Sequence, residues 1–227
     1  MYANSRPVSS AQPGPHPRLA EMVQRHLRHP YRRPVSTDAQ ARFDQLAQQL
    51  RGDPRPLVLD AGCGTGASSL ILARRHAQAL VVGVDKSAAR LATGQRLLAR
   101  AGAPQNVCLL RLDLVDFWLL AARAGWCFQH QYLLYPNPWP KPEHVQRRWA
   151  AHPVLPALLA CGGALELRSN WEIYAREWGE ALQLAGRRWH IDCFDETADA
   201  AALSPFEAKY RDSGHRLWRV RAEAAAR

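Results

Sequence analysis

The stretch LVLDAGCGTGAS, residues 57–68, passes from an apolar run through a glycine-rich turn into a new pattern. Residues 57–61 have the length and branched apolar side chains of a short buried strand. Three glycines then occupy every second position, and the residues after them favour a helix. Gly62, Gly64 and Ala67 satisfy the fingerprint G-x-G-x-x-G/A, in which a strand turns tightly into a helix beside a ligand. The stretch therefore predicts the first strand, turn and helix of an α/β domain.

Strands and helices alternate along the rest of the chain. Further strands are expected at residues 80–85, 106–113, 130–136 and 164–170, and helices at residues 67–77, 87–102, 114–125 and 171–186. This alternation predicts a doubly wound, Rossmann-like α/β sheet with mostly parallel strands. Two last strands, residues 188–194 and 215–222, flank a loop, which predicts an antiparallel pair at the C-terminal edge. We assign residues 55–227 to this domain.

The N-terminal part of the chain has a different composition. Residues 1–17 are rich in proline and serine, so we expect a disordered arm. Residues 18–54 form a basic extension with helical spacing of its apolar residues. A second amphipathic helix is expected at residues 36–50, where a serine and a threonine supply capping groups. Five arginines lie at the start of this extension: Arg18, Arg25, Arg28, Arg32 and Arg33.

The charge of the chain points to a polyanionic partner. The net charge is +10, and lysine supplies only three of the positive charges. Arginine binds phosphate through two parallel hydrogen bonds, so a domain this basic suits a nucleic acid, although composition alone also fits a merely solvated surface. No run approaches the roughly 20 apolar residues that span a bilayer. The N-terminus lacks an apolar leader segment, and we expect a cytoplasmic protein with no membrane partner. The five dispersed cysteines are expected to be reduced thiols, with no metal.

Acidic residues stand at the ends of three successive predicted strands: Asp60, Asp85 and Asp113. The carboxyl ends of parallel strands meet at one edge of a sheet, so these acids line one crevice. Asp60 is a poor neighbour for a pyrophosphate, because like charges repel at short range. It suits the ammonium and sulfonium of S-adenosylmethionine. Asp85 can accept from both ribose hydroxyls and Asp113 from the adenine amino group. Asp116 competes for the second role but is expected to be an acid of the first helical turn.

We therefore expect S-adenosylmethionine as the cofactor. The glycines of the turn complete its predicted site, namely Gly62, Gly64 and Gly66. Together with the acids, this turn resembles the class I methyltransferase fold over about residues 55–221. In that fold the loop after the fourth strand faces the transferable methyl group. Here that loop is the elbow YPNPWPK, residues 135–141.

Three segments resemble bacterial tRNA (guanine-N7)-methyltransferases, and they occur in the family's order. YPNPWPKPEHVQRRW, residues 135–149, resembles a signature in which Pro-Asp-Pro-Trp leads to a lysine, a histidine and paired arginines. LRSNWEIYAREW, residues 167–178, resembles the family's Thr-Asp-Trp segment. LSPFEAKY, residues 203–210, resembles its Thr-x-Phe-Glu loop. The N-terminal stretch RRPVSTDAQ, residues 32–40, resembles the family's arginine-rich N-terminal segment more weakly.

The resemblance implies direct in-line methylation of N7 of a guanine in the tRNA variable loop, by a monomer. Asn137 occupies the position of the family's proposed catalytic aspartate and also meets the cofactor. The implied substrate contacts are Lys141, His144, Arg147, Arg148, Asn170, Ser204, Phe206 and Glu207. Trp139 either stacks on a base or forms a wall of the core.

Two aspartates of the family are asparagine here, Asn137 and Asn170. Guanine N7 has an in-plane lone pair and no proton, so its methylation needs no general base, and an amide keeps an acceptor oxygen. Asn-Pro-Trp also resembles the Asn-Pro-Pro-aromatic motif of amino-group methyltransferases, which leaves an exocyclic amine of RNA or of a small molecule as an alternative acceptor. A third alternative is a tRNA-binding module with weakened catalysis.

Overall fold

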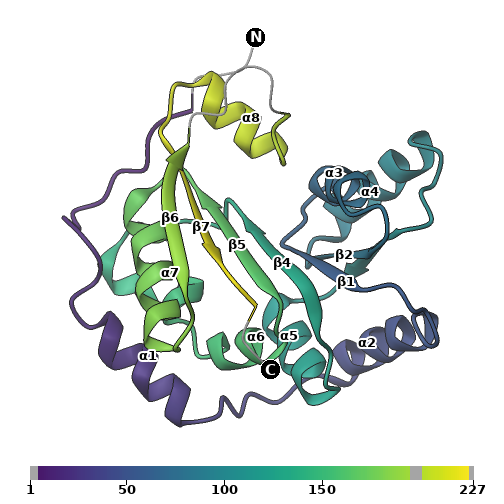
Figure 1. Ribbon diagram of the computed structural model, residues 1–227, viewed down its shortest axis with the longest axis horizontal. Helices are drawn as coiled ribbons and strands as arrows, with labels where there is room; N and C mark the ends of the chain where they lie inside the picture. Colours follow the sequence, from purple (N-terminus) through teal and green to yellow (C-terminus); the bar gives the residue numbers. More distant parts are fainter. Residues whose placement is uncertain (1–4, 195–200, 225–227) are drawn as a thin grey trace.

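A seven-stranded sheet runs through the computed structural model, which describes residues 5–194 and 201–224 (Figure 1). The strands are β1 (Leu57–Ala61), β2 (Leu80–Asp85), β3 (Val107–Arg111), β4 (Phe128–Leu134), β5 (Ala164–Ser169), β6 (Trp189–Phe194) and β7 (Leu217–Ala222). The α-helices are α1 (Leu19–Arg28), α2 (Thr37–Gln49), α3 (Ala67–Arg75), α4 (Ala88–Arg100), α5 (Leu114–Arg123), α6 (Leu155–Ala160), α7 (Glu172–Leu184) and α8 (Pro205–Asp212). Two 3₁₀ turns, η1 (Pro142–Arg147) and η2 (Trp149–Ala151), lie between β4 and α6.

The strand order is β3-β2-β1-β4-β5-β7-β6. The first five strands of the sheet are parallel, and β7 runs antiparallel to both β5 and β6. This confirms the expected α/β class, the parallel majority and the antiparallel pair at the C-terminal edge. The last strand of the chain inserts between β5 and β6 instead of closing the sheet from outside. The loop before β7 thereby returns to the carboxyl ends of the parallel strands.

Helices cover both faces of the sheet. Successive residues of a strand point to opposite faces, and β1 shows the result. Leu59 belongs to the main core, which also holds buried side chains of α1, α2, α5, α6 and α7. Val58 packs on the other face with Leu72 and Ala73 of α3. Residues 18–54 therefore contribute to the same core as the sheet, since α1 contacts α7 and α2 contacts α5.

Short polar side chains begin several helices, which confirms the capping predicted for the helix at residues 36–50. Ser36, Ser87 and Asp113 accept hydrogen bonds from the first-turn amides of α2, α4 and α5. Ser204 does the same for α8, a helix that sequence analysis treated as a loop. Short α6 and the two 3₁₀ turns were also missed, because each is too short to show helical periodicity.

The N-terminal arm differs from the expectation of disorder. Residues 5–17 run along the molecule without helix or strand, and Gln12 is buried against α7. The arm is also bonded near the loop before β7, where the amide of Ser5 donates to Oγ of Ser213. Proline and serine prevent regular structure in this arm, but they do not prevent side chains from docking it. Residues 1–4 of the predicted arm and residues 225–227 of the predicted domain lie outside the described residues.

Candidate active site

The glycine turn after β1 leaves its backbone open toward the sheet edge. Gly62, Gly64 and Gly66 all have positive φ angles, of 80°, 57° and 70°. Side chains with a Cβ rarely adopt this conformation, so glycine is required for the turn. The amide of Gly64 donates to Oδ2 of Asp85 at 3.1 Å, which joins the turn to the end of β2.

Asp85 and Asp113 line one cavity beside this turn. The cavity has a volume of about 170 Å³, and Gly62 and Leu114 form part of its wall. Oδ1 of Asp85 accepts from the amide of Ser87 at 2.8 Å, which fixes the carboxylate in place. Asp113 caps α5 by accepting from the amide of Val115 at 2.9 Å. Each carboxylate oxygen has two lone pairs, so both acids keep capacity to accept from a ligand.

Arg33 reaches the same region from the N-terminal extension. Its guanidinium lies 3.9 Å from Asp113 and 3.5 Å from Asp116. Asp116 lies in the first turn of α5, as expected, and burial raises the pKa of its carboxyl group. At least this arginine of the basic extension thus faces carboxylates of the protein.

Asp60 lies elsewhere than the sequence suggested. Its side chain is fully buried, and its Oδ2 accepts from the hydroxyls of Ser68 at 2.6 Å and Ser69 at 2.7 Å. Burial raises the pKa of this carboxyl group to about 6. These two hydrogen bonds hold the start of α3 against β1, and Asp60 is not among the residues that line the two cavities beside the turn.

The proline elbow forms the next part of the site. Tyr135 and Trp139 have positive φ angles of 53° and 46°, which is costly for residues with large side chains. Oδ1 of Asn137 accepts from the amide of Trp139 at 3.3 Å and closes a short turn. Strain of this kind persists only where the surrounding structure enforces it, and it is concentrated at functional sites.

Asn137 lines a second cavity, of about 410 Å³, which also contains the cofactor residues Gly62 and Asp85. Its far wall comes from α8, where Phe206 stacks on Tyr210 with ring centroids 6.2 Å apart. Phe206 is the one large apolar side chain reported as exposed among the described residues, at 50%. The structure therefore brings together, in one cavity, residues expected to bind the cofactor and residues expected to bind the substrate.

A third cavity, of about 440 Å³, adjoins the second at the elbow and is cationic. Asn137 and Trp139 line it together with Lys86, Arg90 and Arg147. The guanidinium of Arg147 lies 4.6 Å from the ring centroid of Trp139, a cation–π contact. Trp139 therefore forms the wall of an open cavity and is not a core residue.

Several residues of these cavities were not predicted from the sequence. Lys86 directly follows the end of β2 and Arg90 lies in the first turn of α4, so their position just after a strand was the available signal. Trp149, which lines all three cavities, ends the quoted signature but had no assigned role.

Several predicted substrate residues have other contacts. Arg148 is completely buried and paired with Glu177, so the expected contact with RNA phosphate is wrong. Glu207 is also buried, and it accepts from Arg168 at 2.8 Å and from the hydroxyl of Tyr135 at 3.0 Å. Ser204 is occupied as the cap of α8. These two residues hold α8 in place, Ser204 at its first turn and Glu207 through Arg168 and Tyr135.

Three further predicted residues lie near the elbow or the loop before β7. Asn170 is within 3.1 Å of Nδ1 of His215 and does not line the 410 Å³ cavity. His144 meets the edge of the Trp139 ring, with centroids 5.7 Å apart. Lys141 is exposed, and its carbonyl accepts from the amide of His144 at 3.0 Å.

Comparison with known proteins agrees with this geometry. A solved 16S rRNA (adenine(1408)-N(1))-methyltransferase from Catenulisporales acidiphilia, crystallised with S-adenosylmethionine, shares the fold with a TM-score of 0.57 at 21% identity. The match covers 81% of this chain and 92% of that one. The likeness shows that the sheet and its helices have the fold found in that methyltransferase. Among the described residues, no group of three His, Cys, Asp or Glu side chains is placed to hold a metal.

The sequence comparisons are more specific. A family described as putative methyltransferase matches residues 54–220. A tRNA (guanine-N(7)-)-methyltransferase of Leifsonia xyli subsp. xyli is 32% identical, over 74% of this chain and 76% of its own length. One of the same description from Thermotoga maritima is 27% identical over 79% of this chain, but the match spans only 57% of that protein. The chain belongs to this methyltransferase family, whose curated members include tRNA (guanine-N(7)-)-methyltransferases.

Proposed function

We propose that this protein transfers a methyl group from S-adenosylmethionine to N7 of a guanine in tRNA. The observation that carries the proposal is the 410 Å³ cavity, in which Gly62 and Asp85 share one space with Asn137 and Phe206. A methyl donor held at the glycine turn and a base held against α8 would meet at the elbow. The relatives described as tRNA (guanine-N(7)-)-methyltransferases support the acceptor.

The residues present fit S-adenosylmethionine. Asp85 would accept from the ribose hydroxyls and Asp113 from the adenine amino group, and the open backbone of the glycine turn leaves room for the amino acid part. The bound cofactor supplies an electrophilic methyl group on a sulfonium. Asp60 contributes indirectly, because it fixes the start of α3 below the turn.

The task of the protein in this reaction is to place N7. The guanine nitrogen carries its lone pair in the plane of the ring and has no proton to lose, so placement and charge compensation replace acid–base catalysis. Phe206 and Tyr210 offer a stacked aromatic surface at one wall of the cavity, which Asn137 and Gly62 also line. Asparagine compensates less for the positive charge on the methylated purine than aspartate would, because hydrogen bonds with a charged partner are roughly 1 kcal/mol stronger.

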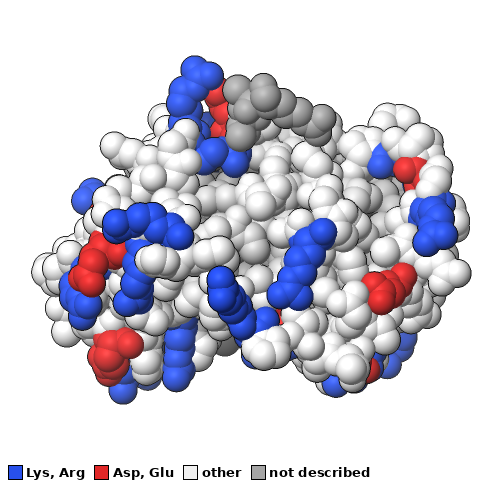
Figure 2. Space-filling view, turned by 90° about the horizontal axis from the view of Figure 1, so that it is seen from below, with Lys and Arg blue, Asp and Glu red and all other residues white. Residues whose placement is uncertain are grey.

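Positive charge surrounds this site and extends over the surface. Lys86, Arg90 and Arg147 line the cavity next to the elbow, where their charges can bind phosphates of the substrate. Figure 2 shows Lys and Arg side chains spread over the face seen from below, with Asp and Glu in a few separate places. No helix of the described residues is long and apolar enough to cross a membrane. With tRNA as substrate, we place the protein in the cytoplasm and treat it as a monomer.

A second acceptor, an exocyclic amine, is favoured by Asn137 itself. Its amide lines both cavities beside the elbow, and an amide oxygen can accept from an amino group. In the structure this oxygen already accepts from the amide of Trp139. An amino-group substrate would therefore have to share it or displace that contact.

The decisive experiment is an in vitro reaction with bulk tRNA and labelled S-adenosylmethionine, followed by nucleoside mass spectrometry. We expect 7-methylguanosine, and a deletion strain should lack it at the position that the enzyme modifies. Label in an N-methylated exocyclic amine would establish the second acceptor. Asn137→Asp discriminates further: an N7 enzyme keeps or gains activity, whereas an amino-group enzyme loses it. Absence of any stabilisation by S-adenosylhomocysteine well above micromolar concentration would leave only an RNA-binding module.

A further inference from the structure

The elbow cannot fix its own shape. Prolines occupy every second position from Pro136 to Pro142, so residues 137, 139 and 141 supply its only backbone donors in that stretch. One of these donors, the amide of Trp139, is used by the Asn137 side chain at 3.3 Å. A segment without its own hydrogen-bond ladder, and with Trp139 at a positive φ, must be held by groups from outside.

Arg148 supplies most of that support. Its guanidinium is completely buried and presents five N–H donors. Nε and Nη2 donate to the carbonyl of Trp139 at 3.1 and 3.0 Å, and Nη2 also lies 3.4 Å from the carbonyl of Lys141. Nη1 donates to both carboxylate oxygens of Glu177, at 2.6 and 2.8 Å. One side chain thus ties two carbonyls of the elbow to helix α7.

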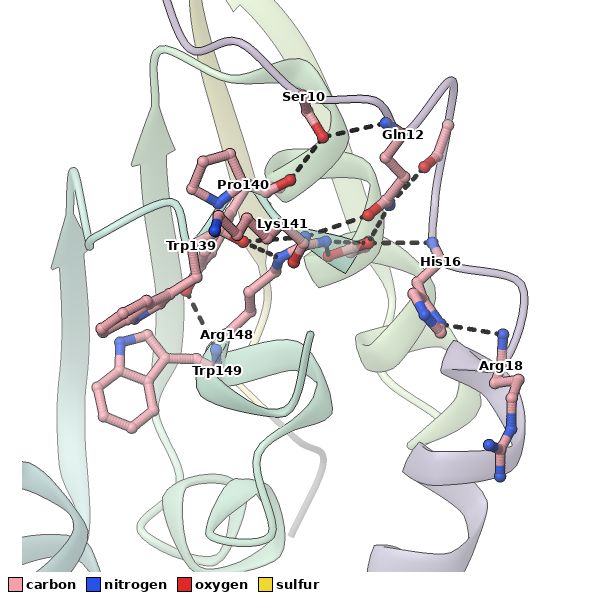
Figure 3. Close-up of polar contacts among 12 residues, drawn as sticks. Ser10, Gln12, His16, Arg18, Trp139, Pro140, Lys141, Arg148 and Trp149 are labelled. Carbon is pink, nitrogen blue, oxygen red and sulfur yellow. Dashed lines mark hydrogen bonds and ion pairs between the residues drawn. The ribbon is translucent and has the colours of Figure 1, made fainter. Parts of the chain in front are cut away.

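The N-terminal arm completes this cluster, as Figure 3 shows. The Gln12 side chain accepts from Nη2 of Arg148 at 3.1 Å and donates to Oε1 of Glu177 at 2.8 Å. The hydroxyl of Ser10 donates to the carbonyl of Pro140 at 2.6 Å. Each of the three successive carbonyls of residues 139–141 therefore accepts from a side chain. Arg148 donates to the carbonyls of Trp139 and Lys141, and Ser10 of the arm donates to the carbonyl of Pro140.

The side chain of Trp139 points away from this cluster. In Figure 3 the indole of Trp139 lies on the opposite side of the elbow from the arm, toward Trp149. Both indoles line the cationic cavity with Asn137. The buried cluster therefore binds the backbone carbonyls of the elbow on the side of the N-terminal arm. The side of the elbow that carries the Trp139 indole faces the cavities where transfer is proposed to occur.

We propose that Arg148, Glu177 and Gln12 are positioning residues for methyl transfer. They hold the backbone of the elbow so that Asn137 and Trp139 keep their orientation toward cofactor and base. The role in transfer rests on the proposed function, whereas the grip on the elbow does not. In this proposal the docked arm has a function, because Ser10 and Gln12 help to hold the elbow of the active site in place.

Arginine is required at the centre of this cluster. A lysine keeps the charge, but its ammonium has three donors around one nitrogen and cannot reach a carboxylate and two carbonyls in different directions.

Gln12→Ala is a milder change than Arg148→Lys, since it leaves the Arg148–Glu177 ion pair intact and removes only the amide that bridges this pair to the arm. Arg219→Lys is a matched control, because Arg219 forms a two-pronged pair with Asp192 away from these cavities.

The test measures hydrogen exchange by mass spectrometry in peptides that cover residues 135–148, for wild type and the three variants. Affinity for S-adenosylhomocysteine and kcat and KM with bulk tRNA are measured on the same preparations. We expect faster exchange of the elbow amides in Arg148→Lys and Gln12→Ala. We also expect kcat per cofactor-binding site to fall at least tenfold, with the Kd of S-adenosylhomocysteine changed less than twofold. Arg219→Lys should change neither exchange of the elbow nor kcat per site.

A merely structural role would lower the Tm of the variants and leave kcat per site unchanged, and that result overturns the proposal. Elbow exchange as slow as in wild type overturns it as well. If Arg148→Lys does not fold, Gln12→Ala decides the outcome alone. If wild type methylates no tRNA, the proposed function fails, and the exchange data still decide whether the cluster holds the elbow.

Discussion

Glu207→Gln separates the role that sequence suggests for this residue from the role that the structure shows. The sequence resemblance places Glu207 against the guanine, whereas its carboxylate is buried. It accepts from Nη1 of Arg168 at 2.8 Å, from the hydroxyl of Tyr135 at 3.0 Å and from the amide of Leu203 at 3.0 Å. The substitution keeps the shape of the side chain and removes its charge.

The size of the effect follows from burial. Removing one partner of a buried ion pair costs about 3–5 kcal/mol, because the other charge is left without compensation. Here Arg168 keeps Glu166 at 2.7 Å, and glutamine keeps one acceptor oxygen. Burial lowers the pKa of Arg168, but Glu166 and Glu207 outweigh it and the net shift is upward. We therefore expect a loss of about 2–3 kcal/mol in the free energy of unfolding, below the full cost of an unpaired charge.

Thermal unfolding is the assay. For a chain of this size each kcal/mol corresponds to about 2–4 °C, so the Tm of Glu207→Gln should fall by roughly 5–10 °C. Glu172→Gln is the matched control: the same change breaks a more exposed pair with Arg176 on α7, which should cost no more than about 0.5 kcal/mol. Below the transition, Glu207→Gln should keep measurable methyl transfer. A Tm equal to that of the control, combined with abolished transfer, would show that Glu207 contacts the substrate and that the reasoning from burial is wrong.

Three other predictions concern the cavities and the turn. Phe206→Ala should lower kcat/KM for tRNA by roughly 5- to 150-fold, the equivalent of about 1–3 kcal/mol of base stacking, without a change in Tm; a lower Tm at unchanged kinetics would contradict a stacking role. Asp85→Asn should raise the Kd of S-adenosylhomocysteine roughly 10- to 150-fold in calorimetry, because about 1.5–3 kcal/mol of charged hydrogen bonding is lost; an unchanged Kd would remove Asp85 from the cofactor site. Asp60 has a folded-state pKa of about 6 against 3.8 for an ordinary aspartate, so its contribution to stability is fully present below pH 3.8 and is lost as pH rises through 6. Asp60→Asn should therefore gain stability relative to wild type between pH 4 and pH 7, by up to about 3 kcal/mol in denaturant titrations, and a pH-independent difference would contradict burial of the charge.

The order of the elements could be predicted from sequence because it depends on local patterns. The alternation of short apolar runs with amphipathic segments predicted the parallel strands and four of the helices that cover the sheet, α3, α4, α5 and α7. The glycine turn was predicted on the same local basis, since positive φ angles at Gly62 and Gly64 exclude other side chains. The docking of the N-terminal arm was not predictable in this way, because its partner Glu177 lies 165 residues from Gln12.

For neighbouring residues of one motif, the sequence did not show which side chain would be buried and which would line a cavity. Arg147 and Arg148 are identical in type, yet one lies over Trp139 at the cavity and the other is buried against Glu177. Phe206 and Glu207 were both assigned to the guanine, yet the phenyl ring is exposed and the carboxylate is buried. Arg168 of β5 donates to Glu207 and through it holds the start of α8, although the two residues are 39 positions apart in the chain.

The α/β sheet, the glycine turn and the methyltransferase family can be predicted from sequence alone, because they depend on backbone sterics, on residue periodicity and on motifs contiguous in the chain. Which charged side chains line the cavities and which are buried as supports became known from the folded structure. That choice depends on partners far away in the chain: Arg148 and Glu177 are 29 residues apart, and Arg168 and Glu207 are 39 apart. A buried charge needs a partner that compensates the loss of water, and only the folded chain brings that partner within hydrogen-bond distance.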